Sequence, residues 1–125
     1  MNLDLVIVGN PLAEMKPTIP LMANVFIEPF GNGYNEALNR GAKKGNSDYI
    51  GFCNNDLIFL DDSIPYLIEA LQQFDSVSPW CPKTHKQWWH NTEPSGYQKG
   101  YTTGKIVAGW CIFVKRETWE KIGGS

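Results

Sequence analysis

The feature that most constrains the fold is a glycine-rich turn that leads into a helix pattern and then a buried strand, all within residues 31–62. The turn, Gly-Asn-Gly at 31–33, permits positive φ values and a tight reversal. Apolar residues at helical spacing predict a helix over 34–44, which Gly45 ends. An apolar run at 49–53 predicts a strand in the centre of a sheet. Helices that alternate with buried strands indicate the α/β class.

A polar run, Asn54-Asn55-Asp56, follows the central strand directly. In α/β proteins ligands bind at the carboxyl ends of the strands, so these side chains stand where a site is expected. Amide and carboxylate oxygens suit a hard divalent cation, and a cation suits a phosphate group. The alternative for Asp56 is structural, with its carboxylate capping the turn after the strand.

The rest of the chain predicts further strands and helices around this centre. The predicted strands are 3–8, 25–27 and 105–114, and the predicted helices are 64–74, with Asp61, Asp62 and Ser63 as candidate caps, and 116–122. Residues 75–104 are rich in Pro, Gly, Trp and Thr. They predict a long irregular loop with at most one short strand.

Length and composition predict one domain over residues 1–125 in a reducing compartment. The net charge of −2 gives no reason to expect a nucleic-acid or membrane partner. The N-terminus is acidic at Asp4, and its apolar run is too short for a signal peptide or a membrane span. Three cysteines at irregular spacing fit a reduced, cytoplasmic protein better than a disulfide framework.

Two segments resemble glycosyltransferase family 2, which has the GT-A fold. The first is similar to the family segment N-x-G-[FY]-x-x-A-x-N-x-G, matched by Asn32, Gly33, Tyr34, Ala37, Asn39 and Gly41. It places the polar run 54–56 at the family's D-x-D position. The second, residues 109–124, is similar to G-x-x-x-x-x-[RK]-R-x-x-[FW]-x-x-x-G-G. The resemblance implies a GT-A-like three-layer α/β/α sandwich with a mainly parallel sheet.

The same resemblance implies a site for a nucleotide-diphosphate sugar, most often UDP-linked. Asp56 would bind Mn²⁺ or Mg²⁺ next to the diphosphate. The residues implied at the nucleotide are Asn10, Asn32, Gly33, Asn39, Asn54, Asn55 and Trp110. Asn54 and Asn55 replace carboxylates often found in the motif, and neutral amides attract a cation less strongly. A structural hydrogen bond for Asn39 and a position away from the ligand for Trp110 are open alternatives.

The resemblance also implies a truncated member of the family. The family's first strand and helix, and the region after Gly124 that holds the catalytic base, have no counterpart in the sequence. No catalytic residue is therefore assigned, and Glu93 is the first candidate for a substitute base. The expected function is sugar transfer to an unknown acceptor. The alternatives are a non-catalytic nucleotide-sugar-binding module, or a domain that a partner chain or a second copy completes. A purely structural interaction domain would leave the polar run unexplained.

Some other polar and aromatic residues give weaker signals. Cys81, His85 and His90 have the spacing C-x3-H-x4-H, which matches no standard zinc site. The tryptophans at 88–89 could stack on a sugar or a base, or else anchor their loop. Arg40 could approach a phosphate, or lie on an exposed helix face.

Overall fold

Five strands form a single mixed sheet in the described part of the chain, with helices on both faces. The computed structural model describes residues 2–60, 63–79 and 111–124. The strands are β1 (Leu3–Val8), β2 (Asn24–Glu28), β3 (Tyr49–Asn54), β4 (Ser76–Val77) and β5 (Cys111–Lys115). The helices are α1 (Tyr34–Lys44), α2 (Ser63–Ala70) and α4 (Arg116–Ile122), with a 3₁₀ helix, η1, at Lys16–Thr18.

The strand order places β3 at the centre of the sheet and β2 and β4 at its edges. The order is β2-β1-β3-β5-β4. Strands β1, β2 and β3 are parallel, and β5 runs antiparallel to both of its neighbours, β3 and β4. Strand β5 therefore runs against all the others, and the sheet is mainly parallel as predicted.

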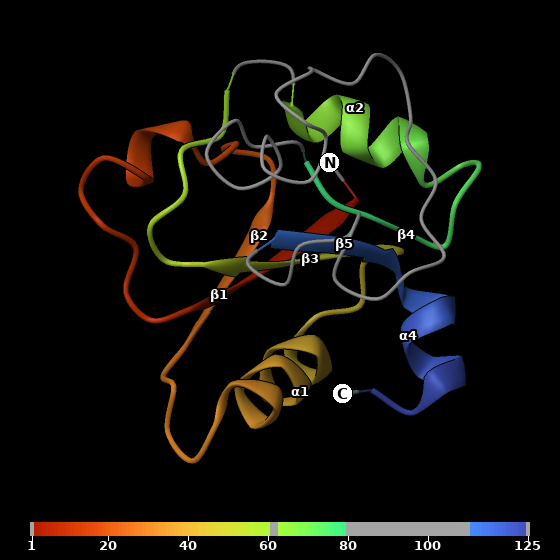
Figure 1. Cartoon of the computed structure of the whole chain (residues 1–125), viewed down its shortest axis with the longest axis horizontal. Coiled ribbons are helices and arrows are strands. Elements are labelled where there is room, and N and C mark those ends of the chain that lie inside the picture. The colour runs from red at the N-terminus through yellow and green to blue at the C-terminus, as the bar shows by residue number, and fades with distance from the viewer. Residues whose placement is uncertain (1, 61–62, 80–110, 125) are drawn as a thin grey trace, which may run out of the picture.

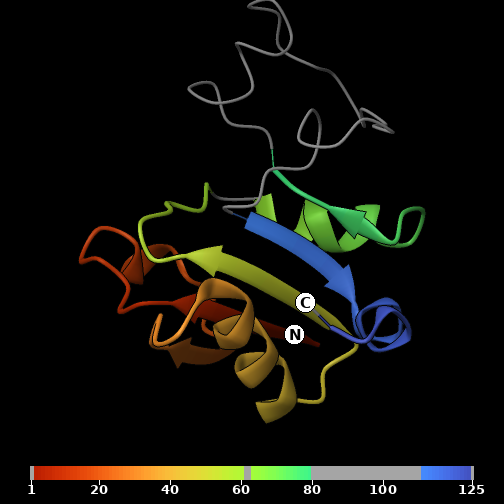
Figure 2. The ribbon, with the colours of Figure 1, turned by 60° about the horizontal axis from the view of Figure 1, so that its bottom comes forward.

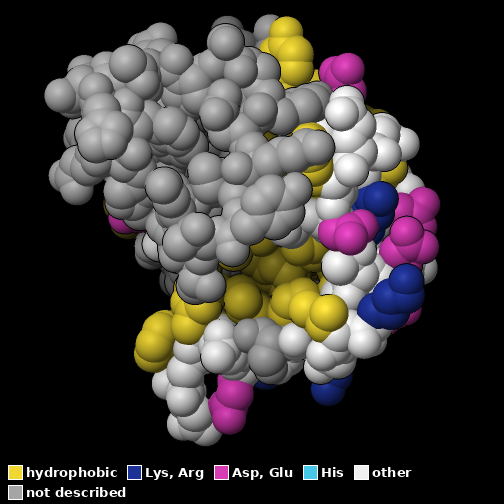
Figure 3. All heavy atoms as spheres, turned by 45° about the vertical axis from the view of Figure 1, so that its right-hand side comes forward, with side chains coloured by type: hydrophobic (Ala, Val, Ile, Leu, Met, Phe, Trp, Pro, Cys, Tyr) yellow, Lys and Arg dark blue, Asp and Glu magenta, His cyan; other side chains and the backbone are white. Residues whose placement is uncertain are grey.

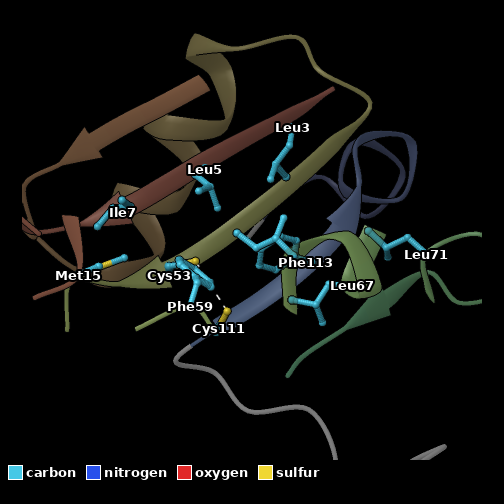
Figure 4. Packing of buried hydrophobic residues seen from close by; sticks show 11 residues of the cluster. Leu3, Leu5, Ile7, Met15, Cys53, Phe59, Leu67, Leu71, Cys111 and Phe113 are labelled. Atoms are coloured by element: carbon cyan, nitrogen blue, oxygen red, sulfur yellow. Dashed lines mark hydrogen bonds between the residues drawn. The ribbon is translucent and has the colours of Figure 1, made fainter. Parts of the chain in front are cut away.

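The molecule has three layers, which confirms the predicted α/β/α sandwich. In Figure 1, α2 lies above the sheet, and α1 and α4 lie below it. Figure 2 shows α1 running along the underside of the strands. The core between the sheet and α2 contains Leu3, Leu5, Ile7, Met15, Cys53, Phe59, Ile64, Leu67, Leu71, Cys111 and Phe113 (Figure 4). The core on the α1 side contains Val6, Val8, Ala37, Leu38, Ala42, Ile50, Phe52 and Val114.

Strand β1 belongs to both cores, which explains its nearly continuous apolar sequence. All six of its residues are buried. Successive side chains of a strand point to opposite faces, so Leu5 and Ile7 pack toward α2, and Val6 and Val8 pack toward α1. A strand covered on both faces needs apolar residues at consecutive positions.

Most predicted elements are present, with some shifted ends. Helix α1 has the predicted bounds, and Gly45 follows it in an extended conformation (φ −113°) rather than a left-handed one. Helix α2 starts at Ser63 and ends four residues earlier than predicted, because its last turn tightens into 3₁₀-type hydrogen bonds such as Gln73 N–H to Ala70 O. Strand β5 extends to Lys115, and the earlier part of that predicted strand lies outside the described residues.

Asp4 is the one charged residue of β1, and it is fully buried. The Arg116 guanidinium donates to its carboxylate at 2.6 Å, and the Ser47 backbone N–H and hydroxyl donate at 3.1 and 2.7 Å. Asn24 adds a hydrogen bond of 3.2 Å from β2. The sequence interpretation treated Asp4 only as part of an acidic terminus. It is instead the centre of a buried network that ties α4 to the start of β1.

Two cysteines face each other across the sheet. Cys53 of β3 and Cys111 of β5 are register partners, and their Sγ atoms lie 3.7 Å apart (Figure 4). Both are free thiols. Burial, followed by the hydrogen bond with Cys111, raises the pKa of the Cys53 thiol well above its ordinary value. The Cys53 thiol therefore remains protonated at neutral pH.

Candidate functional site

The carboxyl ends of β1 and β3 lie side by side, because the two strands are parallel neighbours with Val8 opposite Asn54. The residues that follow each strand therefore meet at one edge of the sheet. The structure brings Asn10, Asn54 and Asn55 together there, as expected from the positions of these residues at strand ends.

Asn55 connects the segment after β1 to the turn after β3. Its side-chain Nδ2 donates to the Asn10 carbonyl at 2.9 Å. Its own backbone carbonyl accepts a hydrogen bond from the Leu12 N–H, also at 2.9 Å. Gly9 lies against the same side chain, since a Cβ at position 9 would be 3.0 Å from Asn55 Nδ2.

Asn54 is held from the other side by Tyr34, the first residue of α1. The Tyr34 hydroxyl donates to Asn54 Oδ1 at 3.1 Å. Burial, and then the nearby Cys53 and Cys111, raise the pKa of Tyr34 above its ordinary value, so its hydroxyl remains a donor at neutral pH. The amide oxygen of Asn54 is thus already engaged. Its amide N–H groups and the second lone pair of its oxygen are what it can offer to a ligand.

Asp56 is exposed, and no hydrogen bond or ion pair links its carboxylate to another described residue. Among residues 2–60, 63–79 and 111–124, no three His, Cys, Asp or Glu side chains gather into a metal-binding group. Mg²⁺ in nucleotide sites commonly takes one or two carboxylates, with phosphate oxygens and waters completing its coordination. The single carboxylate at Asp56 fits that kind of site and does not fit a cage built from protein ligands.

The glycine-rich turn leads into the N-terminus of α1. Asn32 is exposed, and Gly33, with φ of 150°, is the N-cap residue. A Cβ at Gly33 would have no atom within 4 Å, so the space beside it is open. The first N–H groups of an α-helix lack partners within the helix and favour an anion. Asn32 and Gly33 therefore lie where a phosphate could approach the backbone.

Arg40 is paired with a buried carboxylate, an arrangement that the sequence did not suggest. Its Nε lies 3.2 Å from Glu28 Oε1, and its Nη2 donates to the Pro29 carbonyl at 2.6 Å. Lys44 also donates to Glu28. Burial pushes the pKa of Glu28 upward, but the hydrogen bonds and charges of Lys44 and Arg40 outweigh it and leave that pKa below its ordinary value. Arg40 thus stabilises the segment that leads into the glycine-rich turn.

Asn39 borders a different region. It lines a hollow of about 410 Å³ with Ala42, Lys43, Gly45, Arg116, Trp119, Glu120, Gly123 and Gly124. Gly45 and Arg116 also contact Asp4, near the start of β1, so this hollow extends toward the amino-terminal ends of the strands. The position agrees with the structural alternative for Asn39.

Hydrophobic side chains gather in a hollow on the face from which Figure 3 is drawn, and charged side chains lie along one side of it. Ligand pockets commonly combine an apolar lining with a few polar groups at the rim.

Several predicted residues lie outside the described part of the chain. They are Trp110, the tryptophans at 88–89, Cys81, His85, His90, Glu93 and the candidate caps Asp61 and Asp62. Ser76–Val77 forms a short strand inside the predicted loop, and the remainder of that loop from residue 80 is likewise outside.

The sequence reasoning missed three residues that shape this edge. Tyr34 was part of the matched motif, but its role as the partner of Asn54 required knowing that α1 begins beside the end of β3. Gly9 and Leu12 carry no polar side chain. The contribution of Leu12 is a backbone N–H, which leaves no residue-type signal, and the glycine at position 9 was the one available sign of its left-handed conformation.

Comparison with known proteins gave one match. The sequence model of a family described as Glycosyl transferase family 2 matches residues 12–122, which is most of the chain. Neither the curated proteins nor the solved structures that were searched gave a match. Within the described residues, every helix is too short or too polar to cross a membrane.

Proposed function

The chain belongs to glycosyl transferase family 2, and from this membership we propose that it binds a nucleotide-diphosphate sugar, with UDP as the nucleotide, and transfers the sugar to an acceptor. The observation that carries the proposal is the polar turn at the end of β3, within the segment that matches the family. The donor would lie across the carboxyl ends of β1 and β3, with residues 1–125 acting as one domain.

The proposed cation ligand is Asp56, with Mn²⁺ or Mg²⁺ as the cation. Its exposed carboxylate has no competing ion pair among the described residues, which supports this role. When bound, the cation would neutralise charge on the departing diphosphate. Asn54 would donate its amide N–H groups to oxygens of the donor, and the hydrogen bond from Tyr34 orients its side chain.

The proposed diphosphate position is next to the turn at 31–33. The open space at Gly33 allows a phosphate to approach the backbone, and the N-terminus of α1 favours negative charge. Asn32 is exposed at the same turn and would donate from its side-chain amide. The proposed compartment is the reducing cytoplasm, with the free thiols of Cys53 and Cys111 in support.

A second candidate is a non-catalytic nucleotide-sugar-binding module. It is favoured by the polar turn itself, which contains a single carboxylate. If Asp56 binds the cation, it is not available to deprotonate an acceptor hydroxyl, and general-base assistance is typically worth about 10²–10⁴ in rate. A partner chain or a second copy that supplies a base would reconcile the two candidates.

Calorimetric titration with UDP, in the presence and absence of Mn²⁺, tests the binding proposal. We expect binding that Mn²⁺ strengthens. An absence of binding under both conditions would contradict the proposal. An assay of UDP release from several UDP-sugars with a broad acceptor pool then separates the two candidates. Turnover at about 1 s⁻¹ or faster supports a transferase, and binding without turnover supports the module.

A further inference from the structure

The two asparagines of the polar turn are engaged through opposite ends of their amides. Asn54 accepts at its oxygen from Tyr34, at 3.1 Å, whereas Asn55 donates from its nitrogen to the Asn10 carbonyl, at 2.9 Å. Each asparagine is thus oriented by a partner on a different segment of the fold.

We propose that Asn55 is a positioning residue, which joins the segment after β1 to the turn after β3. This inference rests on the proposed function, because it concerns the donor site described there. It departs from the sequence prediction, in which Asn55 contacts the nucleotide itself.

Three contacts connect the segment after β1 to the turn after β3, and we call this connection the joint. The side chain of Asn55 donates to the Asn10 carbonyl, and the backbone carbonyl of Asn55 accepts from the Leu12 N–H, so the segment is held at two points. Gly9 completes the joint by close packing. Its φ of 89° is a left-handed conformation that favours glycine, and any side chain there would press on the Asn55 amide.

The joint fixes two predicted donor-binding residues relative to each other. Asn10 follows β1, Asp56 follows β3, and Asn55 is bonded to the first and covalently attached to the second. If the joint loosens, the segment after β1 moves independently of Asp56. A preorganised site loses affinity when its parts must be ordered on binding. The loss should therefore occur whether or not the cation is present.

Asn55→Asp gives opposite expectations for a positioning residue and for a cation ligand. If Asn55 is a positioning residue, the substitution removes the N–H donor of the hydrogen bond to Asn10 and places a carboxylate against the Asn10 carbonyl. UDP affinity should then fall by about three- to tenfold with and without Mn²⁺. As a ligand, the new carboxylate would strengthen Mn²⁺ binding. Stronger Mn²⁺-dependent binding of UDP by Asn55→Asp would overturn the proposal.

The matched control is Asn46→Asp, the same substitution at an exposed residue before the start of β3. It should leave UDP affinity unchanged.

A measurement without nucleotide keeps the two proposals distinguishable. Hydrogen exchange of the Leu12 amide in the free protein should become faster by about threefold or more in both Asn55→Asp and Asn55→Ala. Unchanged exchange of the Leu12 amide in both variants would contradict the proposed role of Asn55, even if UDP binds. Faster exchange in a protein that binds no UDP would support the joint while contradicting the proposed function.

Discussion

Each of the three polar residues after β3 is held differently by its neighbours. Asn54 accepts from Tyr34, Asn55 donates to the Asn10 carbonyl, and Asp56 is exposed without a described partner. The chemical capacity of each residue follows from these contacts. The Asp56 carboxylate, which pairs with no other described residue, is the charged group in this turn that can attract a cation.

Asp56→Ala should remove the part of UDP affinity that depends on Mn²⁺ and leave the fold intact. Because the side chain is exposed, the free energy of unfolding should change by less than about 0.5 kcal/mol. Titration of UDP with and without Mn²⁺ measures the first effect, and urea unfolding measures the second. The exposed Glu117 of α4 provides the control, since Glu117→Ala should alter neither quantity. A folded Asp56→Ala variant with full Mn²⁺ dependence would rule out the assignment.

Asp4→Ala should be one of the most destabilising single changes in the chain. It removes the carboxylate that accepts from Arg116, Ser47 and Asn24 in a fully buried position. Removal of one partner of a buried pair typically costs about 3–5 kcal/mol, because the other charge stays buried without compensation. Urea unfolding measures the loss. A cost below about 1 kcal/mol would mean that Arg116 finds water or another acceptor.

At the scale of elements, α1 packs on the sheet through a glycine. A Cβ added at Gly41 would lie 2.3 Å from Val6 Cγ1 of β1. The close approach of helix and strand therefore requires a residue without a side chain at this position. Helix propensity alone favours alanine over glycine by about 1 kcal/mol. Packing and propensity therefore oppose each other at this position.

We expect packing to prevail, with Gly41→Ala destabilising the protein by about 1–3 kcal/mol in urea unfolding. The second variant, Val6→Ala, removes the atoms that the new methyl group would meet. The cost of the double variant should therefore be smaller than the sum of the two single costs. A more stable Gly41→Ala protein would show that helix and strand separate easily.

The contact of α1 with the end of β2 should make the free energy of unfolding depend on pH in the acidic range. The pKa of Glu28 in the folded chain lies below its ordinary value of 4.5, so the unfolded carboxylate takes up a proton at higher pH than the folded one. The stability that Lys44 and Arg40 supply through Glu28 is therefore fully present above about pH 4.5. It is lost as the pH falls through the folded pKa.

Glu28→Gln isolates this contribution. Its free energy of unfolding should be lower than that of the unaltered protein by about 1–2 kcal/mol near pH 7, since both cations are partly solvated. The difference should shrink as the pH falls below 4.5. Urea unfolding of both proteins across a pH series provides the comparison. A difference that does not change with pH would mean that charge on Glu28 contributes nothing.

At the scale of the whole molecule, β1 and β3 contribute buried residues to both cores. Each of these two strands has buried residues facing α2 and buried residues facing α1. Strand β2, at the edge, exposes Val25 and Ile27. Amide protons in β1 and β3 should therefore exchange only through global unfolding, and those in β2 through smaller openings. Native-state hydrogen exchange measures this order. Faster exchange in β1 than in β2 would contradict it.

The order of elements could be predicted because it is written in local patterns. The helix at 34–44 has apolar residues at a helical period and glycines at both ends, so its bounds match α1. The runs at 3–8 and 49–53 are apolar at consecutive positions, which a strand covered on both faces requires. The polar run at 54–56 then marked the edge of the sheet at which a site is expected.

The partners of individual residues depended on the tertiary structure, because they are far apart in the sequence. Asp4 lies 112 positions from Arg116, and Asn10 lies 45 positions from Asn55. The residue type alone does not reveal whether an asparagine offers its oxygen or its nitrogen. Folding decides this by placing a hydroxyl beside Asn54 and a carbonyl beside Asn55, since each amide turns toward the partner that satisfies it.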